Sequence, residues 1–412
     1  MSQFVLAGGT VFDGDDFLAG PSDVVFDDDR VVAVGPGLAG SDAHAGAEIV
    51  DCSGRTVLPG LIDLHIHAAF SNPGSLNAFV EPFSWQFFQS VTHLERTLRA
   101  GVTTVRDAGG ADLGTKMAVD QGIISGPRMR IAVSIMSQTG GHADHWMVSG
   151  AHSPAFAAHP GRPSGVADGA AEVRKVAREI LRAGADQIKI CSSGGVLSPA
   201  DDPRHAQFTE DEIRVIVDEA AAQGRYVMAH AQAAPGVKSA LRAGVRSIEH
   251  GIYLDDEAIE LFRERDAYLV PTLAAPLAVI RKAEASDSGL PPAVVEKARM
   301  VVDIHRESIA TAWAAGVRIA MGTDSGVGVH GENLEELALL ADIGMDLRSV
   351  LRAGTSVAGE LIAPENTVGR LAPGFLADAV VLDGELRSVD QLRDLPATVR
   401  QVWKDGRRQV DA

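Results

Sequence analysis

The interior of the chain repeats one pattern of apolar and polar positions. An Ala-rich, helix-favouring stretch stops at a glycine, a short apolar or β-branched run follows at once, and a polar residue ends the run. Glycine suits the left-handed position that follows a helix, and short apolar runs are typical of buried parallel strands. Segments with this pattern are LRAGVTTVRD, LRAGADQIKI, AAQGRYVMAH, LRAGVRSIEH and WAAGVRIAMGTD. They predict alternating helices and parallel strands.

The strands that this pattern predicts cover residues 61–67, 102–106, 128–134, 186–191, 226–231, 246–250, 268–272 and 318–323, with helices such as 210–222 and 297–314 between them. Parallel strands in this number, with polar residues at their carboxyl ends, describe a (β/α)8 TIM-type barrel. An open, flavodoxin-like sheet would need fewer strands and would gather its ligand residues at one switch point. We therefore predict an α/β fold with a barrel domain over residues 59–365.

The two chain ends have a different pattern. Residues 1–58 and 366–412 alternate apolar and polar positions around Gly and Asp turns, which is typical of short antiparallel strands. We expect both ends to build one small β-sandwich domain beside the barrel. Residues 138–169 are rich in Gly, Pro and His, and connections of this length are usually functional or disordered.

Composition limits the partners and the compartment. The 412 residues are 46% hydrophobic and 22% charged, enough for a large core, and the formal net charge is −18. That charge argues against nucleic acid or an anionic membrane as the main partner. The sequence contains no uninterrupted run of about 18 apolar residues, so no membrane span is expected. The first residues lack the basic leader of a secretory signal. Two cysteines, Cys52 and Cys191, are too few for a disulfide framework, so we expect a cytoplasmic protein. We expect its partner to be a small-molecule substrate.

A metal site is indicated by the segment LPGLIDLHIHAAF. Side chains alternate along a strand, so His65 and His67 share one face and converge near its end. An isolated pair of this kind also occurs as two core histidines. His230, His250 and Asp324 end further predicted strands, and a barrel brings such ends to one mouth. This set of imidazoles and a carboxylate suits Zn²⁺ or a similar first-row ion.

Lys189 distinguishes between kinds of metal site. In DQIKICSSGG its side chain is predicted to point into the barrel, where an ammonium beside cations would be costly. A neutral Lys189 can instead react with CO₂ to give a carbamate (N6-carboxylysine), an anionic ligand able to bridge two metal ions. The alternative is a structural lysine paired with a carboxylate such as Asp63 or Asp107.

The complete ligand series resembles the binuclear branch of the amidohydrolase superfamily: His65, His67, Lys189, His230, His250 and Asp324. The framing segments of that superfamily are similar to GGTVFDG, VLPGLIDLHIH and NTVGRLAPGFLADAVVLDG. The resemblance implies two divalent ions, one on the first two histidines and the aspartate and one on the other two histidines, with the carboxylated lysine between them. Within the superfamily, VTTVRDAGG, QTGGH, SSGGVLSPADDP, IEHG and HGENLEEL resemble the Xaa-Pro dipeptidase-like group. That group includes zinc carboxypeptidases of acylated amino acids or dipeptides, and hydrolases of ochratoxin-type amides.

Two metal ions permit a bridging hydroxide near neutral pH, which predicts hydrolysis of an amide-like C–N bond. Asp324, beside that hydroxide, would take its proton and deliver it to the departing amine. Substrate-binding candidates are His142, which follows two glycines and whose counterpart in the similar proteins helps bind substrate, and His330. Gln232 is the third candidate, at a position where carboxypeptidase-like relatives often have a tyrosine that holds the substrate carboxylate. Because glutamine reaches less far, carbamates, ureas, anilides and a lactone stay open as substrates.

Two other functional classes remain as alternatives. A mononuclear deaminase or imidazolonepropionase-like hydrolase would not need Lys189, and a non-catalytic homologue would be expected to lack ligands. The sequence leaves the roles of His145 and Trp146 undecided, and Asp107 could either orient a ligand or form a structural ion pair. A homo-oligomer is also expected.

Overall fold

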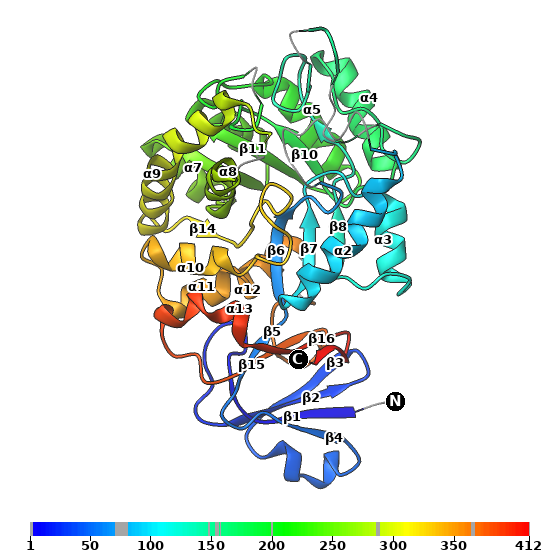
Figure 1. Ribbon diagram of the computed structural model, residues 1–412, viewed down its shortest axis with the longest axis vertical. Helices are drawn as coiled ribbons and strands as arrows, with labels where there is room; N and C mark the ends of the chain where they lie inside the picture. Colours follow the sequence, from blue (N-terminus) through cyan, green and yellow to red (C-terminus); the bar gives the residue numbers. More distant parts are fainter. Residues whose placement is uncertain are drawn as a thin grey trace.

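The computed structural model describes residues 3–70, 81–146, 149–152, 156, 158–198, 201–285, 289–363 and 367–411. Figure 1 shows a sheet-rich end that carries both termini and a larger part built from parallel strands and helices. The predicted boundary between residues 365 and 366 and parts of the 138–169 connection lie outside the described residues. No helix in the described ranges is both long and apolar enough to cross a membrane.

One eight-stranded sheet is formed by both ends of the chain. Its strands are β1 (Gln3–Val11), β2 (Ser22–Asp27), β3 (Arg30–Gly35), β4 (Glu48–Asp51), β5 (Thr56–Pro59), β15 (Ala379–Leu382), β16 (Val399–Lys404) and β17 (Arg407–Asp411). Their order is β17-β16-β15-β5-β1-β2-β3, and β4 pairs with β1. The antiparallel pairing of β15 with β5 joins the carboxyl-terminal strands to the amino-terminal ones. Two short helical turns, η1 (Leu38–Gly40) and η2 (Asp42–His44), precede β4.

Apolar side chains from both ends fill a separate core in this sheet. Trp403 on β16 is fully buried, and its ring centroid lies 4.9 Å from that of Phe4 and 5.9 Å from that of Phe26. These contacts join residues about 400 positions apart in the chain. Because large aromatic rings bury much apolar area, this packing holds the two ends together.

The larger part contains two parallel sheets. The three-stranded sheet is β6 (Leu61–Ile66), β7 (Val102–Asp107) and β8 (Arg128–Ile131). The six-stranded sheet is β9 (Ile135–Met136), β10 (Ile188–Cys191), β11 (Val227–Ala233), β12 (Ser247–Tyr253), β13 (Tyr268–Val270) and β14 (Arg318–Ile319), in chain order. A mixed α/β fold with parallel sheets is therefore confirmed, but among the described residues the strands do not form one continuous eight-stranded sheet.

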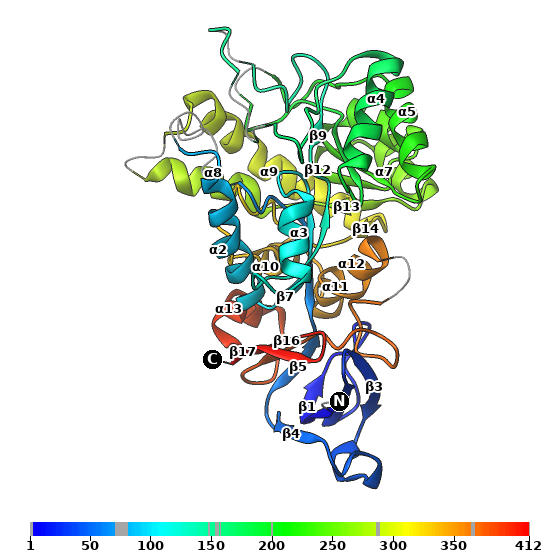
Figure 2. The same cartoon turned by 90° about the vertical axis from the view of Figure 1, so that its right-hand side faces the viewer.

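Helices follow the parallel strands and pack around them (Figures 1 and 2). They are α2 (Trp85–Arg99), α3 (Leu113–Asp120), α4 (Gly169–Arg182), α5 (Glu210–Ala221), α6 (Ala234–Ala243), α7 (Asp256–Glu264), α8 (Ala274–Glu284), α9 (Pro292–Ala314), α10 (Glu335–Asp342), α11 (Leu347–Ala353) and α12 (Ser356–Ile362), with η3 (Val389–Arg393) and α13 (Leu395–Thr398) near the carboxyl terminus. The glycines predicted to follow helices all have positive φ, between 66° and 99°: Gly101, Gly184, Gly224, Gly244 and Gly316. That part of the sequence pattern is confirmed.

Two of the predicted strands differ from the structure. The third, expected over residues 128–134, is interrupted between β8 and β9, because Val133 has a left-handed φ of 64° instead of the extended conformation of a regular strand. The eighth shortens to β14, although backbone hydrogen bonds continue beyond it: Leu64 N donates to Met321 O at 3.0 Å and His67 N to Ser325 O at 2.8 Å. The segment after β14 therefore lies directly against β6.

Candidate metal centre

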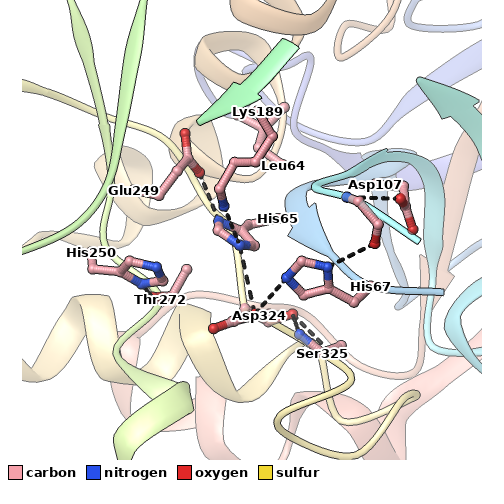
Figure 3. A network of polar contacts seen from close by, with 12 residues as sticks. Leu64, His65, His67, Asp107, Lys189, Glu249, His250, Thr272, Asp324 and Ser325 are labelled. Carbon is pink, nitrogen blue, oxygen red and sulfur yellow. Dashed lines mark hydrogen bonds and ion pairs between the residues drawn. The ribbon is translucent and has the colours of Figure 1, made fainter. Parts of the chain in front are cut away.

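Two histidines and an aspartate form the centre of the site. His65 is near the end of the wholly buried strand β6, His67 directly follows the strand, and Asp324 lies in the segment after β14. Asp324 Oδ1 is 3.6 Å from His65 Nε2 and 3.3 Å from His67 Nε2 (Figure 3). One ligand atom from each buried side chain lies within 4.8 Å of the other two, so the group could hold a metal ion. These predicted ligands are therefore brought together.

Hydrogen bonds determine which ring nitrogen of each histidine can bind a metal. His67 Nδ1 lies 2.8 Å from Gly109 O, and a carbonyl only accepts, so Nδ1 carries the hydrogen of the neutral ring. His65 Nδ1 donates in the same way to Glu249 Oε2 at 2.8 Å. Both Nε2 atoms therefore keep a lone pair and face the Asp324 carboxylate. This set of nitrogen and oxygen donors fits a divalent metal ion.

His230 and His250 lie beside this group without belonging to it. The His250 ring centroid is 5.2 Å from that of His65 and 4.6 Å from that of His230. His250 Nδ1 donates to Thr272 Oγ1 at 2.7 Å, because the Thr272 hydroxyl itself donates to a carbonyl. His230 Nε2 donates to Gly194 O at 3.1 Å. The nitrogens left with lone pairs are Nε2 of His250 and Nδ1 of His230.

Burial keeps these imidazoles neutral, which is the form that binds metals. It lowers the pKa of His65, His230 and His250 well below the usual value, and the charges of neighbouring Lys189 and histidines lower it further. Burial alone would raise the pKa of Asp324, but the charge interactions with His65 and His67 outweigh it and hold that pKa below its usual value. Asp324 therefore remains a carboxylate.

Lys189 is placed beside the group by β10. Its side chain is 2% exposed, and Nζ lies 3.2 Å from His65 Nε2. Burial lowers the pKa of the amine. Among the described residues no carboxylate forms an ion pair with Lys189 within 4.0 Å. Lys189 therefore forms no ion pair with Asp63 or Asp107 in the described structure, although the charges of Glu249 and Asp324 act on its pKa in the opposite direction to burial.

The carboxylates of Asp63 and Asp107 have other partners. Asp63 accepts hydrogen bonds from Thr323 Oγ1 at 2.6 Å and Asn333 Nδ2 at 2.7 Å. Asp107 accepts from the backbone nitrogens of Ala68, Gly109 and Ala111 at 2.8–3.2 Å. Asp107 therefore orders the loop that supplies the carbonyl partner of His67, and it has no ion pair within the part of the chain that the structure describes.

Several site residues have a left-handed backbone that is rare for residues other than glycine. The φ angles are 75° for His250, 55° for Thr272 and 58° for Asp324. Each such conformation costs about 1–3 kcal/mol and persists only where the surroundings enforce it, typically at functional sites. His250 lies within β12, Thr272 lies two residues after β13, and Asp324 lies in the segment that follows β14.

Two of the predicted substrate-binding residues lie close to the ligand histidines. The His142 ring stacks on that of His230, with centroids 4.3 Å apart and planes 13° apart, and its Nδ1 lies 3.0 Å from Asp201 Oδ2. Gln232 is the penultimate residue of β11, and within the described residues its buried Oε1 has no hydrogen-bond partner. An unpaired buried acceptor can bind a substrate donor.

The remaining candidates are His330, His145 and Trp146. His330 stacks on His93 from α2, with centroids 4.1 Å apart, and its Nε2 lies 3.2 Å from Phe70 O. Burial lowers the pKa of His330 to about 3. Trp146 is 50% exposed, and burial lowers the pKa of His145 to about 4.

Sequence reasoning missed Glu249, whose side chain is fully buried. It accepts hydrogen bonds from His65, from Arg106 Nη2 at 2.8 Å and from Ser247 Oγ at 2.6 Å. The available signal was an acidic residue within the otherwise buried run SIEHG, since an ionised side chain in such a strand needs a partner.

The chain matches the family model described as the amidohydrolase family over residues 56–409. It is 32% identical over 366 residues to ochratoxinase from Aspergillus niger, covering 85% of this chain and 75% of that protein. A crystal structure of a prolidase complexed with N-methylphosphonate-L-proline is 37% identical with a TM-score of 0.91, and the match covers 100% of both chains. A Xaa-Pro dipeptidase structure with bound methionine is 32% identical with a TM-score of 0.89, covering 99% of this chain and 100% of that one.

Proposed function

This chain belongs to the amidohydrolase family, and we propose that it hydrolyses an amide-like C–N bond with the help of two divalent metal ions. The observation that carries this proposal is the convergence of His65 Nε2, His67 Nε2 and Asp324 Oδ1. Each histidine has its other nitrogen engaged by a fixed acceptor, so the three donor atoms are oriented before any ion arrives.

We assign the second ion to His230, His250 and Lys189. The neutral Lys189 amine would attack the carbon of CO₂, form an N–C bond and release a proton, which leaves an anionic N6-carboxylysine. Burial favours this step because it lowers the pKa of the amine more than the charges of Glu249 and Asp324 raise it, and no described carboxylate forms an ion pair with Lys189 within 4.0 Å. Zn²⁺ is the ion that this mixture of imidazole and carboxylate donors suits best.

The residues of the chain then have separate tasks. When bound, the ions lower the pKa of water and polarise the carbonyl of the substrate. The Asp324 carboxylate accepts the proton of the attacking water and delivers it to the nitrogen of the leaving amine. His142, Gln232 and His330 bind the substrate. The Gln232 amide, whose Oε1 is buried without a partner among the described residues, would accept a hydrogen bond from a substrate N–H.

We propose a dipeptide or an N-acyl amino acid as the substrate. Similarity to a prolidase and a Xaa-Pro dipeptidase supports a dipeptide, and similarity to ochratoxinase supports an N-acyl amino acid. A carbamate, urea or anilide on the same two ions is the alternative if no substrate carboxylate is needed. A mononuclear deaminase or imidazolonepropionase-like enzyme is the other alternative, and a relative named imidazolonepropionase from Streptomyces griseus is 25% identical.

The remaining expectations are proposals about architecture. The two parallel sheets would close into one barrel through the backbone bonds between β6 and the segment after β14. Residues 59–365 would form the barrel domain, and 1–58 with 366–412 the β-sandwich domain. We further propose a cytoplasmic homo-oligomer.

Metal analysis combined with a substrate panel tests the function. Protein purified without chelator should contain two ions per chain and hydrolyse Xaa-Pro dipeptides or N-acyl amino acids. Dialysis against a chelator should abolish turnover, and Zn²⁺ should restore it. One ion per chain with full activity would favour the mononuclear class. If the protein hydrolyses a phenylurea or a carbamate but no dipeptide or N-acyl amino acid, the substrate class is a urea or carbamate. No hydrolysis of any substrate would contradict the proposal.

A further inference from the structure

A buried ionic network lies behind the His65 ring. Glu249 on β12 and Arg106 on β7 are both fully buried. Arg106 Nη2 lies 2.8 Å from Glu249 Oε1, and Glu249 Oε2 lies 2.8 Å from His65 Nδ1. Removing such charges from water is costly, and a buried pair is weak evidence for stability in itself. The network therefore calls for a role besides holding the strands together.

Arg106 fixes the carboxylate as well as neutralising it. Its Nε donates to Leu64 O at 2.7 Å, and its Nη1 donates to Ser247 Oγ at 3.0 Å. The guanidinium thus contacts both Leu64, which precedes His65, and Ser247, which lies two residues before Glu249. Because a guanidinium presents its donors in a rigid planar fork, these bonds leave the Glu249 carboxylate little freedom to turn away from the His65 ring.

The two histidines of the metal group differ in their supporting partner. His67 donates from Nδ1 to the neutral carbonyl of Gly109, whereas His65 donates to the anionic carboxylate of Glu249. A carboxylate behind a ligating imidazole fixes the ring and makes the opposite nitrogen a better electron donor. The opposite nitrogen is His65 Nε2, which lies near both Asp324 Oδ1 and Lys189 Nζ.

We propose that Glu249, held in place by Arg106, is a positioning residue that fixes His65 Nε2 and raises the affinity of the His65–His67–Asp324 group for a divalent ion. The inference rests on the proposed metal-dependent function. It adds a residue that affects metal affinity without binding the metal itself, because Glu249 contacts the ligand His65. Loss of such a partner typically lowers metal affinity about 10–100-fold.

The test is Zn²⁺ affinity, measured by competition with a chromophoric chelator. Glu249→Gln keeps the shape and an acceptor oxygen but removes the charge. We expect it to bind Zn²⁺ about 10–100-fold more weakly than the wild type, and to change the visible spectrum of the Co²⁺-loaded protein. Glu336→Gln is the control for making the same substitution at another fully buried position, where the described residues provide only the backbone nitrogens of Leu273 and Ala274 as donors to the carboxyl group. The control should keep the wild-type affinity and spectrum.

Thermal unfolding of the metal-free proteins separates positioning from a purely structural role. If Glu249→Gln only destabilises the fold, with wild-type affinity per folded molecule and an unchanged Co²⁺ spectrum, the inference is wrong. If this variant does not fold, the double variant Arg106→Gln/Glu249→Gln removes the unpaired cation as well. Weak Zn²⁺ binding by the folded double variant supports the inference, and wild-type binding overturns it. A wild type that binds no Zn²⁺ would instead contradict the proposed function.

Discussion

Replacing Lys189 tests the binuclear site most directly. The side chain is 2% exposed, its Nζ has a lowered pKa and lies 3.2 Å from His65 Nε2, and the described residues offer it no ion-paired carboxylate. Lys189→Met keeps most of the buried chain length but cannot form a carbamate. Lys189→Ala removes the side chain and leaves space for a small carboxylic acid.

The two roles of Lys189 predict opposite effects on stability. If the lysine is only a buried neutral amine, methionine should be neutral or stabilising, because an apolar group replaces a desolvated polar one. If it is carboxylated, each variant loses one metal site. At a free metal concentration 100 times the dissociation constant, one site contributes about 2.7 kcal/mol of stability. With about 2.1 cal/mol/K per residue over 412 residues, the unfolding temperature should fall by about 3 °C.

Elemental analysis, calorimetry and turnover provide the assay. We expect one ion per chain in both variants, a Tm that falls only in the presence of metal, and loss of most turnover. Short-chain carboxylic acids should partly restore Lys189→Ala and leave Lys189→Met unchanged, because methionine fills the space. After exchange with ¹³C-bicarbonate, the wild type should show a carbamate resonance that both variants lack. Two ions and wild-type turnover in Lys189→Met would refute the bridging role.

Three further changes have distinct readouts. Asp324→Asn should keep the circular dichroism spectrum but lower kcat by about 10²–10⁴, since an amide cannot transfer the proton; a near-normal kcat would assign proton transfer elsewhere. His142→Ala should raise KM about ten- to a hundredfold for an N-acyl amino acid, the loss expected for a charge-assisted bond of about 1.5–3 kcal/mol. It should change KM little once the substrate carboxylate is capped as an amide, and an equal effect on both substrates would contradict the contact. Burial raises the pKa of Glu336 from 4.5 to about 8, so its contribution to stability is present below pH 4.5 and is lost as the pH rises through 8. Urea unfolding should therefore show that the wild type loses about 4 kcal/mol more than Glu336→Gln between pH 5 and pH 9, and parallel losses would show that Glu336 stays ionised throughout.

Local patterns allowed much of the fold to be predicted from the sequence. Each glycine that ends a helix has to adopt positive φ, which few other residues tolerate, and all five predicted positions do so. The alternation of side chains along a strand likewise placed His65 and His67 on one face. These features depend on a few neighbouring residues, so they can be predicted from the sequence alone.

Features that depend on contacts between distant segments were not predictable in the same way. Glu249 meets Arg106 across 143 positions and His65 across 184 positions, and no local spacing identifies such partners. His330 follows the short eighth strand, and its ring stacks on His93 from α2, a contact that no local spacing identifies either. The strand break at Val133 was not predicted, because a buried valine usually favours a strand.

The supports of the site also explain how its strained backbone persists. His250, Thr272 and Asp324 each hold a left-handed conformation that costs about 1–3 kcal/mol. Asp63 accepts hydrogen bonds from the backbone nitrogens of His65 and Thr323, so it fastens the strand of the histidines to the segment that ends in Asp324. Glu249 orients the His65 ring by accepting a hydrogen bond from its Nδ1. Because Asp63 holds the backbone nitrogen of His65 and Glu249 holds its ring Nδ1, the two carboxylates fix different atoms of the same ligand.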